Sequence, residues 1–458
     1  MSSHRFQSLN LRSEIGGNSY ALHLDDELII LDAGMHPKED GSDAIPRYAE
    51  IPFDSANGIV VTHSHLDHIG TLPVLQEHQP SAPVFMTAAT AAIGEALLHN
   101  SVNVMKSQRL ELGIVEYPLY THHQIDRVQS HWMAKDYERS FLLDPSGASD
   151  TELTFFDAGH IMGSAGVAIR AQGKTIFYTG DVHFDDHTLS KGARFPKLAS
   201  PDVLIMESTR GAVPRKAGYT LASEQARLAK HIKETVERGG AVMIPVFAIG
   251  KTQEVLTMIH GFKEDGLIPE KTPVIIGGLS TKMTTIYDAF AKQARRTRPG
   301  FEIIREMDIP IAARPRDRKP IEYQAGAVFA ISSGMMSEHT VSNTLARGFL
   351  SNPKNTLLFV GYADPVSPAG LIRSAKKGDL IALDNSHKVE LNCQVEEFDF
   401  SGHATRDDLL EFAVNSRAKN IFLVHGDPDA TEWLKVELEK RLPDSKIIIP
   451  EPKKEYAF

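Results

Sequence analysis

Cysteine is almost absent from this sequence. The 458 residues include a single one, Cys393, so no disulfide bond can form within the chain, as is usual for proteins of a reducing compartment. Long apolar runs are also missing, since none reaches the roughly 18 residues from which a transmembrane helix is built. The opening residues MSSHRFQSLNLRSE contain no apolar signal-peptide core. We therefore expect a cytoplasmic protein that has no membrane partner.

An excess of positive charge is absent as well. Lysine and arginine total 49 against 59 aspartates and glutamates, which gives a net charge of −10. Proteins that coat nucleic acid are usually basic, so this balance excludes broad, non-specific coating. It leaves a local basic channel open, because electrostatic steering depends on where the charges sit. The length of 458 residues suggests about two or three domains.

Short apolar, β-branched runs separated by helical periodicity predict an α/β fold. Leu228, Ile232 and Val236 recur every fourth residue and predict a helix over 223–238, which Gly239 can end. Several predicted strands end in a polar residue able to do chemistry, and functional side chains gather at strand ends in layered α/β proteins. The predicted strands are 28–31, 59–61, 175–178, 203–206, 241–244, 328–331, 356–360, 421–424 and 446–449, and the polar residues at strand ends are Asp32, His63, Asp181, Glu207 and His425.

The strongest motif is THSHLDHIG, directly after the strand at 59–61. It places His63, His65, Asp67 and His68 within six residues, and imidazole and carboxylate are ligands that suit zinc. An extended H-x-H sends His63 and His65 to the same side, toward one ion. The turn that follows redirects Asp67 and His68 toward a second ion. Bound metal offsets the desolvation that such a cluster would otherwise cost.

This motif resembles the signature of the metallo-β-lactamase superfamily. That family also places an aspartate after an early strand, a downstream histidine, a second aspartate after a strand and a last histidine. The segments LIILDAG, FFDAGHIMGSAG, IFYTGDVHF and IFLVHGD supply these residues in the expected order, as Asp32, His160, Asp181 and His425.

The resemblance implies two Zn²⁺ ions per chain. One ion takes His63, His65 and His160, and the other takes Asp67, His68 and His425. Asp181 bridges both ions. Asp32 orients a ligand histidine, as residues behind metal ligands do.

Further motifs resemble the β-CASP branch of the superfamily, which contains nucleases. Glu207 lies in VLIMESTRG, and His403 lies in EEFDFSGHATRDDL. Between them, RGGAVMIPVFAIGKTQEVL, FAISSGMM and NTLLFVGY resemble segments of a β-CASP domain. The implied fold is a metallo-β-lactamase αββα sandwich with an inserted α/β β-CASP domain. Its divisions are 1–208 (first part of the sandwich), 209–388 (insertion) and 389–458 (second part).

Two segments depart from the family pattern. MSEHTVSN stands at 336–343 where relatives carry a glycine-rich turn, and ADPVSP stands at 363–368 where they often carry E-G-T. Both lie where backbone amides would approach phosphates, which leaves substrate preference open. Lys251, Ser333 and Gly334 are the candidate phosphate contacts. Two basic groups are better interpreted as a solvated helix face and an exposed loop, namely Lys292, Arg295, Arg296 and Arg298, and Arg314, Arg316, Arg318 and Lys319.

The resemblance implies a zinc-dependent phosphodiesterase that cleaves single-stranded RNA, by endonuclease or 5′→3′ exonuclease action, to 5′-phosphate and 3′-hydroxyl ends. Asp67, Asp181, Glu207 and His403 are the expected catalytic residues. His403 would protonate the leaving oxygen, and Glu207 would hold the charged form of His403.

Three alternatives are weighed against this function. A DNA nuclease stays open, because no pattern in the sequence senses a 2′-hydroxyl. The insertion disfavours a small-molecule metallohydrolase acting on a thioester or lactone. The complete ligand set disfavours a non-catalytic scaffold. A homodimer is compatible with each of these functions.

Overall fold

The computed structural model describes residues 4–144, 146–310, 320–338, 340–384 and 386–458. Most of the predicted basic loop, with Arg314, Arg316, Arg318 and Lys319, lies outside the described residues, as does His339 within the first departing segment. In the part that is described, no helix is long and apolar enough to cross a membrane.

The chain forms two compact units, which we describe separately. The first unit contains residues 1–186, 192–215 and 403–458, and the second contains 187–191 and 216–402.

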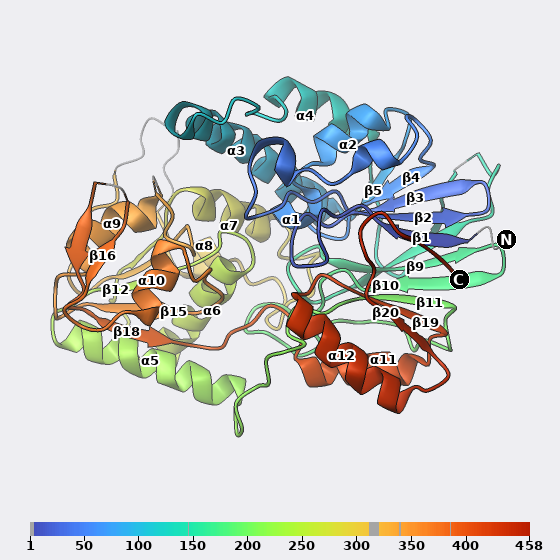
Figure 1. Cartoon of the computed structure of the whole chain (residues 1–458). Coiled ribbons are helices and arrows are strands. Elements are labelled where there is room, and N and C mark those ends of the chain that lie inside the picture. The colour runs from blue at the N-terminus through green and yellow to red at the C-terminus, as the bar shows by residue number, and fades with distance from the viewer. Residues whose placement is uncertain (1–3, 145, 311–319, 339, 385) are drawn as a thin grey trace. The chain divides into compact units, whose positions relative to one another are not determined.

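Two mixed sheets, each with seven described strands, form the centre of the first unit (Figure 1). The first sheet has the order β21 (Glu455–Ala457), β1 (Arg5–Ser8), β2 (Tyr20–Leu24), β3 (Glu27–Leu31), β4 (Gly58–Val60), β5 (Val84–Met86), β6 (Trp132–Ala134). The second has the order β20 (Lys446–Ile448), β19 (Asn420–Val424), β11 (Val203–Glu207), β10 (Lys174–Tyr178), β9 (Ala165–Ala171), β8 (Glu152–Asp157), β7 (Ser140–Leu142).

Strand alternation explains how these sheets are stacked. Along β3, Ile29 and Leu31 join the core between the sheets, whereas Leu28 and Ile30 pack toward the helices outside, because successive side chains of a strand point to opposite faces. The helices over the first sheet are α1 (Leu66–Ile69), α2 (Leu72–His78), α3 (Ala88–Leu112) and α4 (His122–Val128); those over the second are α11 (Arg406–Ser416) and α12 (Pro428–Arg441). The first unit is therefore a helix–sheet–sheet–helix sandwich (Figure 1).

The second unit is built on a sheet of five described strands, all parallel. Its order is β13 (Val274–Ile275), β14 (Val328–Ile331), β12 (Val242–Pro245), β15 (Thr356–Phe359), β18 (Gln394–Glu397), and a hairpin of β16 (Leu380–Ala382) and β17 (Lys388–Glu390) lies apart from it. The helices of this unit are α5 (Leu221–Glu237), α6 (Lys251–Glu264), α7 (Leu279–Ala289), α8 (Ile303–Glu306), α9 (Val341–Phe349) and α10 (Pro368–Ser374).

The predicted elements in both units are confirmed. Each of the nine predicted strands coincides with an observed strand to within one residue at either end. The predicted helix is α5, which Thr220 caps through a capping box. Its Leu228 and Ile232 are buried, and Gly239 has a left-handed φ of 75° just after it.

A short excursion, residues 187–191, leaves the first unit and belongs to the second. Glu254 on α6 accepts hydrogen bonds from the backbone N–H groups of Leu189 (2.7 Å) and Ser190 (3.0 Å). Thr297 N–H donates to the Leu189 carbonyl at 2.8 Å, and the Leu189 side chain is buried. The excursion is thus integrated into the core of the second unit.

Arg296 differs from its interpretation as part of a solvated face. Its side chain is buried, donates to the carbonyls of Phe301 and Tyr287, and lies 3.7 Å from the Asp288 carboxylate. Arg298 instead pairs with Glu264 at 2.7 Å on the surface. Arg296 therefore supports the fold and is not available to a ligand.

Arg296→Ala should lower the free energy of unfolding by about 1–3 kcal/mol, because it takes the hydrogen-bond donor from the carbonyls of the buried residues Phe301 and Tyr287. Lys292→Ala, which removes an exposed basic side chain nearby, should change it by less than about 0.5 kcal/mol. Urea unfolding followed by circular dichroism measures both. Equal midpoints for the two variants would contradict the structural role of Arg296.

Candidate metal centre

The candidate ligands come from loops at one edge of the sandwich. His63 and His65 follow β4, with Asp67 and His68 on the short helix α1, while Asp181 follows β10. Strands β3 and β4 run parallel in the first sheet, as do β10, β11 and β19 in the second. The carboxyl ends of parallel strands meet at the same edge. The fold thereby brings together residues that lie up to 362 positions apart, from His63 to His425.

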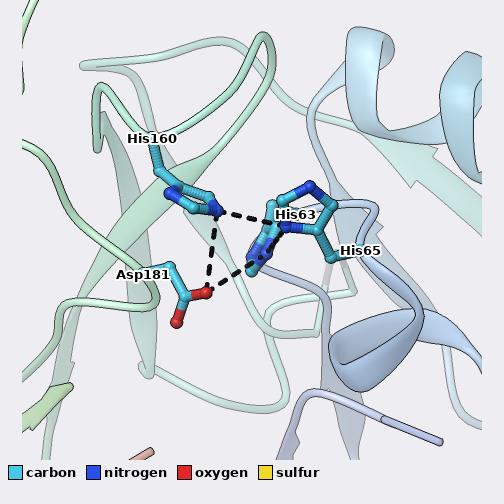
Figure 2. A group of neighbouring side chains, drawn as sticks. All are labelled: His63, His65, His160 and Asp181. Carbon is cyan, nitrogen blue, oxygen red and sulfur yellow. Dashed lines mark hydrogen bonds and ion pairs between the residues drawn. The ribbon is translucent and has the colours of Figure 1, made fainter. Parts of the chain in front are cut away.

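The first donor set is formed by His63, His65, His160 and Asp181 (Figure 2). The Nδ1 atom of His65 lies 3.2 Å from His63 Nε2 and 3.1 Å from His160 Nε2. The Asp181 Oδ2 atom lies 3.5 Å from His63 Nε2 and 3.7 Å from His160 Nε2. Ligand atoms about 2.0–2.2 Å from a tetrahedral zinc ion stand roughly 3.3–3.6 Å apart. The donor spacing therefore fits a single ion of this kind.

A second donor set is formed by Asp67, His68 and His425, on the other oxygen of Asp181. Asp181 Oδ1 lies 3.4 Å from His68 Nε2 and 3.3 Å from His425 Nδ1. Asp67 Oδ2 lies 3.2 Å from His425 Nε2. Asp181 is thus the one carboxylate that faces both sets.

The chemistry of these donors fits a cation. Asp181 Oδ1 is buried and accepts no hydrogen bond from the described residues, although an oxygen in this state is costly without a partner. Burial lowers the pKa of His63 and of His65 and keeps these imidazoles neutral, the form that binds metal. Burial alone would raise the pKa of Asp181, but His425 and His68 hold it well below its usual range.

The carboxylates around His68 favour a positive charge on its ring. Burial opposes protonation of His68, yet Asp181 and Asp32 raise the pKa of His68 well above its usual value. Burial likewise opposes ionisation of Asp67, and His68 and His425 lower the pKa of Asp67 to about 2. The carboxylates of Asp67 and Asp181 are therefore ionised at neutral pH and attract a cation.

Asp32 supports the second set from behind. It is fully buried with a left-handed φ of 60°, a conformation that aspartate tolerates better than most residues. His68 Nδ1–H donates to it at 2.8 Å, which leaves His68 Nε2 directed at Asp181. Tyr178 hydroxyl donates at 2.6 Å, and Thr62 donates through both its N–H (2.7 Å) and its hydroxyl (2.9 Å). Four donors thus fix the carboxylate that sets the His68 tautomer.

Three supporting residues were not identified from the sequence. Tyr178 ends β10 and looks in the sequence like an ordinary strand residue, whereas Thr62 lies between β4 and His63. Thr209 hydroxyl contacts His425 Nδ1 at 2.9 Å. For Thr62, the available signal in the sequence was its position just after a strand and next to the ligand His63.

His403 and Glu207 form a pair beside the donor sets. Glu207 ends β11, is 1% exposed, and lies 3.1 Å from His403 Nδ1. The backbone N–H of Val182 donates to Glu207 at 2.7 Å and fixes its carboxylate. Burial opposes protonation of the imidazole, but Glu207 raises the pKa of His403 to about 9. The His403 ring also lies 4.6 Å from the His160 ring, centroid to centroid.

The candidate phosphate contacts all belong to the second unit. Lys251 is the first residue of α6, and its ammonium donates to the Phe400 carbonyl. Gly334 lines a hollow together with Lys251. Ser333 follows β14 and its hydroxyl accepts from the Met335 N–H at 3.2 Å, so it has a local structural partner.

Three family models match the chain. Residues 29–237 match a beta-lactamase superfamily domain, residues 252–372 match a Beta-Casp domain, and residues 388–450 match a Zn-dependent metallo-hydrolase RNA specificity domain. With the layers described above, these matches confirm the predicted fold class: a metallo-β-lactamase sandwich with an inserted β-CASP domain.

Similar proteins agree with the family models. Endoribonuclease YSH1 of Saccharomyces cerevisiae is 28% identical over 451 residues, which cover 95% of this chain and 56% of the yeast protein. Transcription termination factor FttA of Methanosarcina mazei is 27% identical, over 96% of this chain and 69% of the archaeal protein. The chain thus spans little more than half the length of the curated endoribonuclease.

A solved structure shares the fold. A protein of unknown function from Enterococcus faecalis superposes with a TM-score of 0.58 and 14% identity, over 99% of this chain and 100% of that chain. Sequence, layers and donor sets agree, and the chain belongs to the β-CASP family of metallo-β-lactamase-fold metallohydrolases.

Proposed function

We propose that the chain is a phosphodiesterase that binds two Zn²⁺ ions and cleaves single-stranded RNA, as an endonuclease or a 5′→3′ exonuclease. The single observation that carries the proposal is the meeting of two donor sets on opposite oxygens of Asp181. The family is metal-dependent, and the chain carries clusters able to hold metal. Likeness to an endoribonuclease, and the match of residues 388–450 to an RNA specificity domain, favour RNA over DNA.

The proposed ligands divide as the donor sets do. His63, His65 and His160 would hold one zinc ion, Asp67, His68 and His425 would hold the other, and Asp181 would serve both. When bound, the two zinc ions supply Lewis-acid chemistry that activates water and neutralises charge on a phosphate.

The protein's own residues position the substrate and move the proton. His403 donates a proton to the 3′-oxygen as it leaves, which gives 5′-phosphate and 3′-hydroxyl ends. Glu207 holds His403 in its charged form and in one orientation, through the contact at 3.1 Å. Asp67 acts by anchoring the second donor set, and Asp181 acts by anchoring both sets.

The proposal also includes the domain bounds, the cellular compartment and the partners. The domains are 1–208, 209–388 and 389–458, and the compartment is the cytoplasm, in keeping with a single cysteine. DNA is the alternative substrate. A homodimer is the alternative to a monomer.

Zinc-loaded protein should cut 5′-labelled single-stranded RNA. Discrete internal fragments on a sequencing gel would indicate an endonuclease, and release of mononucleotides alone would indicate a 5′ exonuclease. The control is His65→Ala, which removes the donor nearest both His63 and His160. No cleavage by the wild type, or equal cleavage by His65→Ala, would exclude the proposed function and place DNA or a small ester first.

Asp32→Asn should weaken binding of the second zinc ion by about 10- to 100-fold, as loss of a residue behind a metal ligand does. Asparagine tolerates the left-handed backbone, so the fold should survive. Zinc titration with a competing chelator gives the two affinities. The matched control is Asp43→Asn, at an exposed carboxylate. Two unchanged affinities in Asp32→Asn would remove Asp32 from the centre.

His403→Ala should keep both zinc ions and lower RNA cleavage by about 10²- to 10⁴-fold, the usual effect of losing a general acid. Hydrolysis of bis(p-nitrophenyl) phosphate should fall far less, because its leaving group needs no proton. His123→Ala, at an exposed histidine, serves as the control. An equal loss on both substrates would assign His403 a structural role.

A further inference from the structure

A small hollow in the second unit lies at the carboxyl ends of three parallel strands. Its walls come from residues after β12, β14 and β15 and from the start of α6. In open parallel sheets, ligands bind outside the carboxyl ends of the strands. The residues that line the hollow are Pro245, Val246, Phe247, Lys251, Gly334, Phe359, Val360, Gly361 and Tyr362.

Two aromatic rings at this hollow are exposed. Among the phenylalanines, tyrosines and tryptophans that the structure describes, four are exposed: Phe53, Phe247, Tyr323 and Tyr362. Two of these, Phe247 at 40% and Tyr362 at 61%, line the same hollow. Exposing rings costs the hydrophobic stabilisation that burying them would give, so a pair at one site indicates a surface that binds something flat and apolar.

Phe247 packs closely against a glycine. A Cβ atom at Gly334 would stand 3.3 Å from the Phe247 backbone nitrogen and 3.4 Å from its ring. The strand β12 carries Phe247 just beyond its end, and β15 carries Tyr362 just beyond its own. Both residues therefore follow parallel strands of one sheet, which places them at the same edge of that sheet.

A positively charged side chain, that of Lys251, lines the same hollow. Lys251 begins α6, a helix of 14 residues, and its side chain passes 4.0 Å from the position of a Cβ at Gly361. Its ammonium donates to the Phe400 carbonyl, and Lys251 itself lines the hollow. The hollow thus combines two stacking surfaces with a positive charge at a helix N-terminus, where anions are favoured.

We propose that Phe247 and Tyr362 form a stacking subsite for a base of single-stranded nucleic acid, with Lys251 holding the neighbouring phosphate. Proteins that bind single strands combine aromatic platforms for bases with positive charge along the backbone. A stacking platform accepts any base and does not sense the sugar. The proposal rests on the proposed function, since it concerns the same substrate.

The test is binding of a fluorescein-labelled single-stranded RNA, measured by anisotropy in a His403→Ala background so that cleavage does not consume the probe. Phe247→Ala and Tyr362→Ala should each weaken binding by about 5- to 150-fold. Phe53→Ala, at an exposed ring of the first unit, should leave binding unchanged. Phe247→Tyr and Tyr362→Phe keep a stacking face and should restore affinity, which separates stacking from misfolding.

Two further arms identify the contacts. DNA of the same sequence should show the same losses, because stacking does not depend on the 2′-hydroxyl. Lys251→Gln should lower the slope of log affinity against log salt by about 0.7, the value for one phosphate contact on a single strand.

The outcomes separate the two proposals. If the wild type cleaves RNA and the two alanine variants bind it as tightly as Phe53→Ala does, the stacking subsite is wrong and the proposed function stands. If the His403→Ala protein binds no single strand and the wild type cleaves none, both are wrong. Loss of binding in both alanine variants with rescue by Phe247→Tyr and Tyr362→Phe supports the subsite.

Discussion

One carboxylate, Asp181, connects the two halves of the metal centre. Its Oδ2 atom faces the imidazoles of the first donor set and its Oδ1 atom faces those of the second. Asp181 follows β10 in one sheet, while His63 and His65 follow β4 in the other. The stacking of the two sheets therefore sets the geometry of the centre, and the alternation of buried side chains along each strand sets the stacking.

Much of this arrangement could be predicted from the sequence, and the reason is local. The main metal-binding motif spans only six residues, so its chemistry and spacing are visible in the sequence itself. It contains His63, His65, Asp67 and His68. The apolar runs that carry them are buried strands, and burial on both faces gives a clear pattern. The distant partners could be placed only through the resemblance to a known family, because spacing alone cannot join His63 to His425.

The parts that escaped prediction depend on tertiary contacts. Thr62 and Tyr178 carry no pattern that marks them, since their role is a hydrogen bond to one buried carboxylate. Arg296 looks like its exposed neighbours in sequence, yet the fold turns it inward to backbone carbonyls. Asp32 lies on a distant element from Thr62 and Tyr178, and the partners of Arg296 are backbone carbonyls, so local propensity contains no information about either.

The excursion at 187–191 has a consequence for dissecting the molecule. The second unit is discontinuous: five of its residues come from a loop that otherwise belongs to the first unit. Cutting out 216–402 would leave Leu189 without the apolar surroundings that bury it and Glu254 without the N–H groups of Leu189 and Ser190. The insertion is therefore not a cassette that evolution or an engineer can exchange at two cut points. A functional transplant must carry the five residues 187–191 as a second segment alongside 216–402.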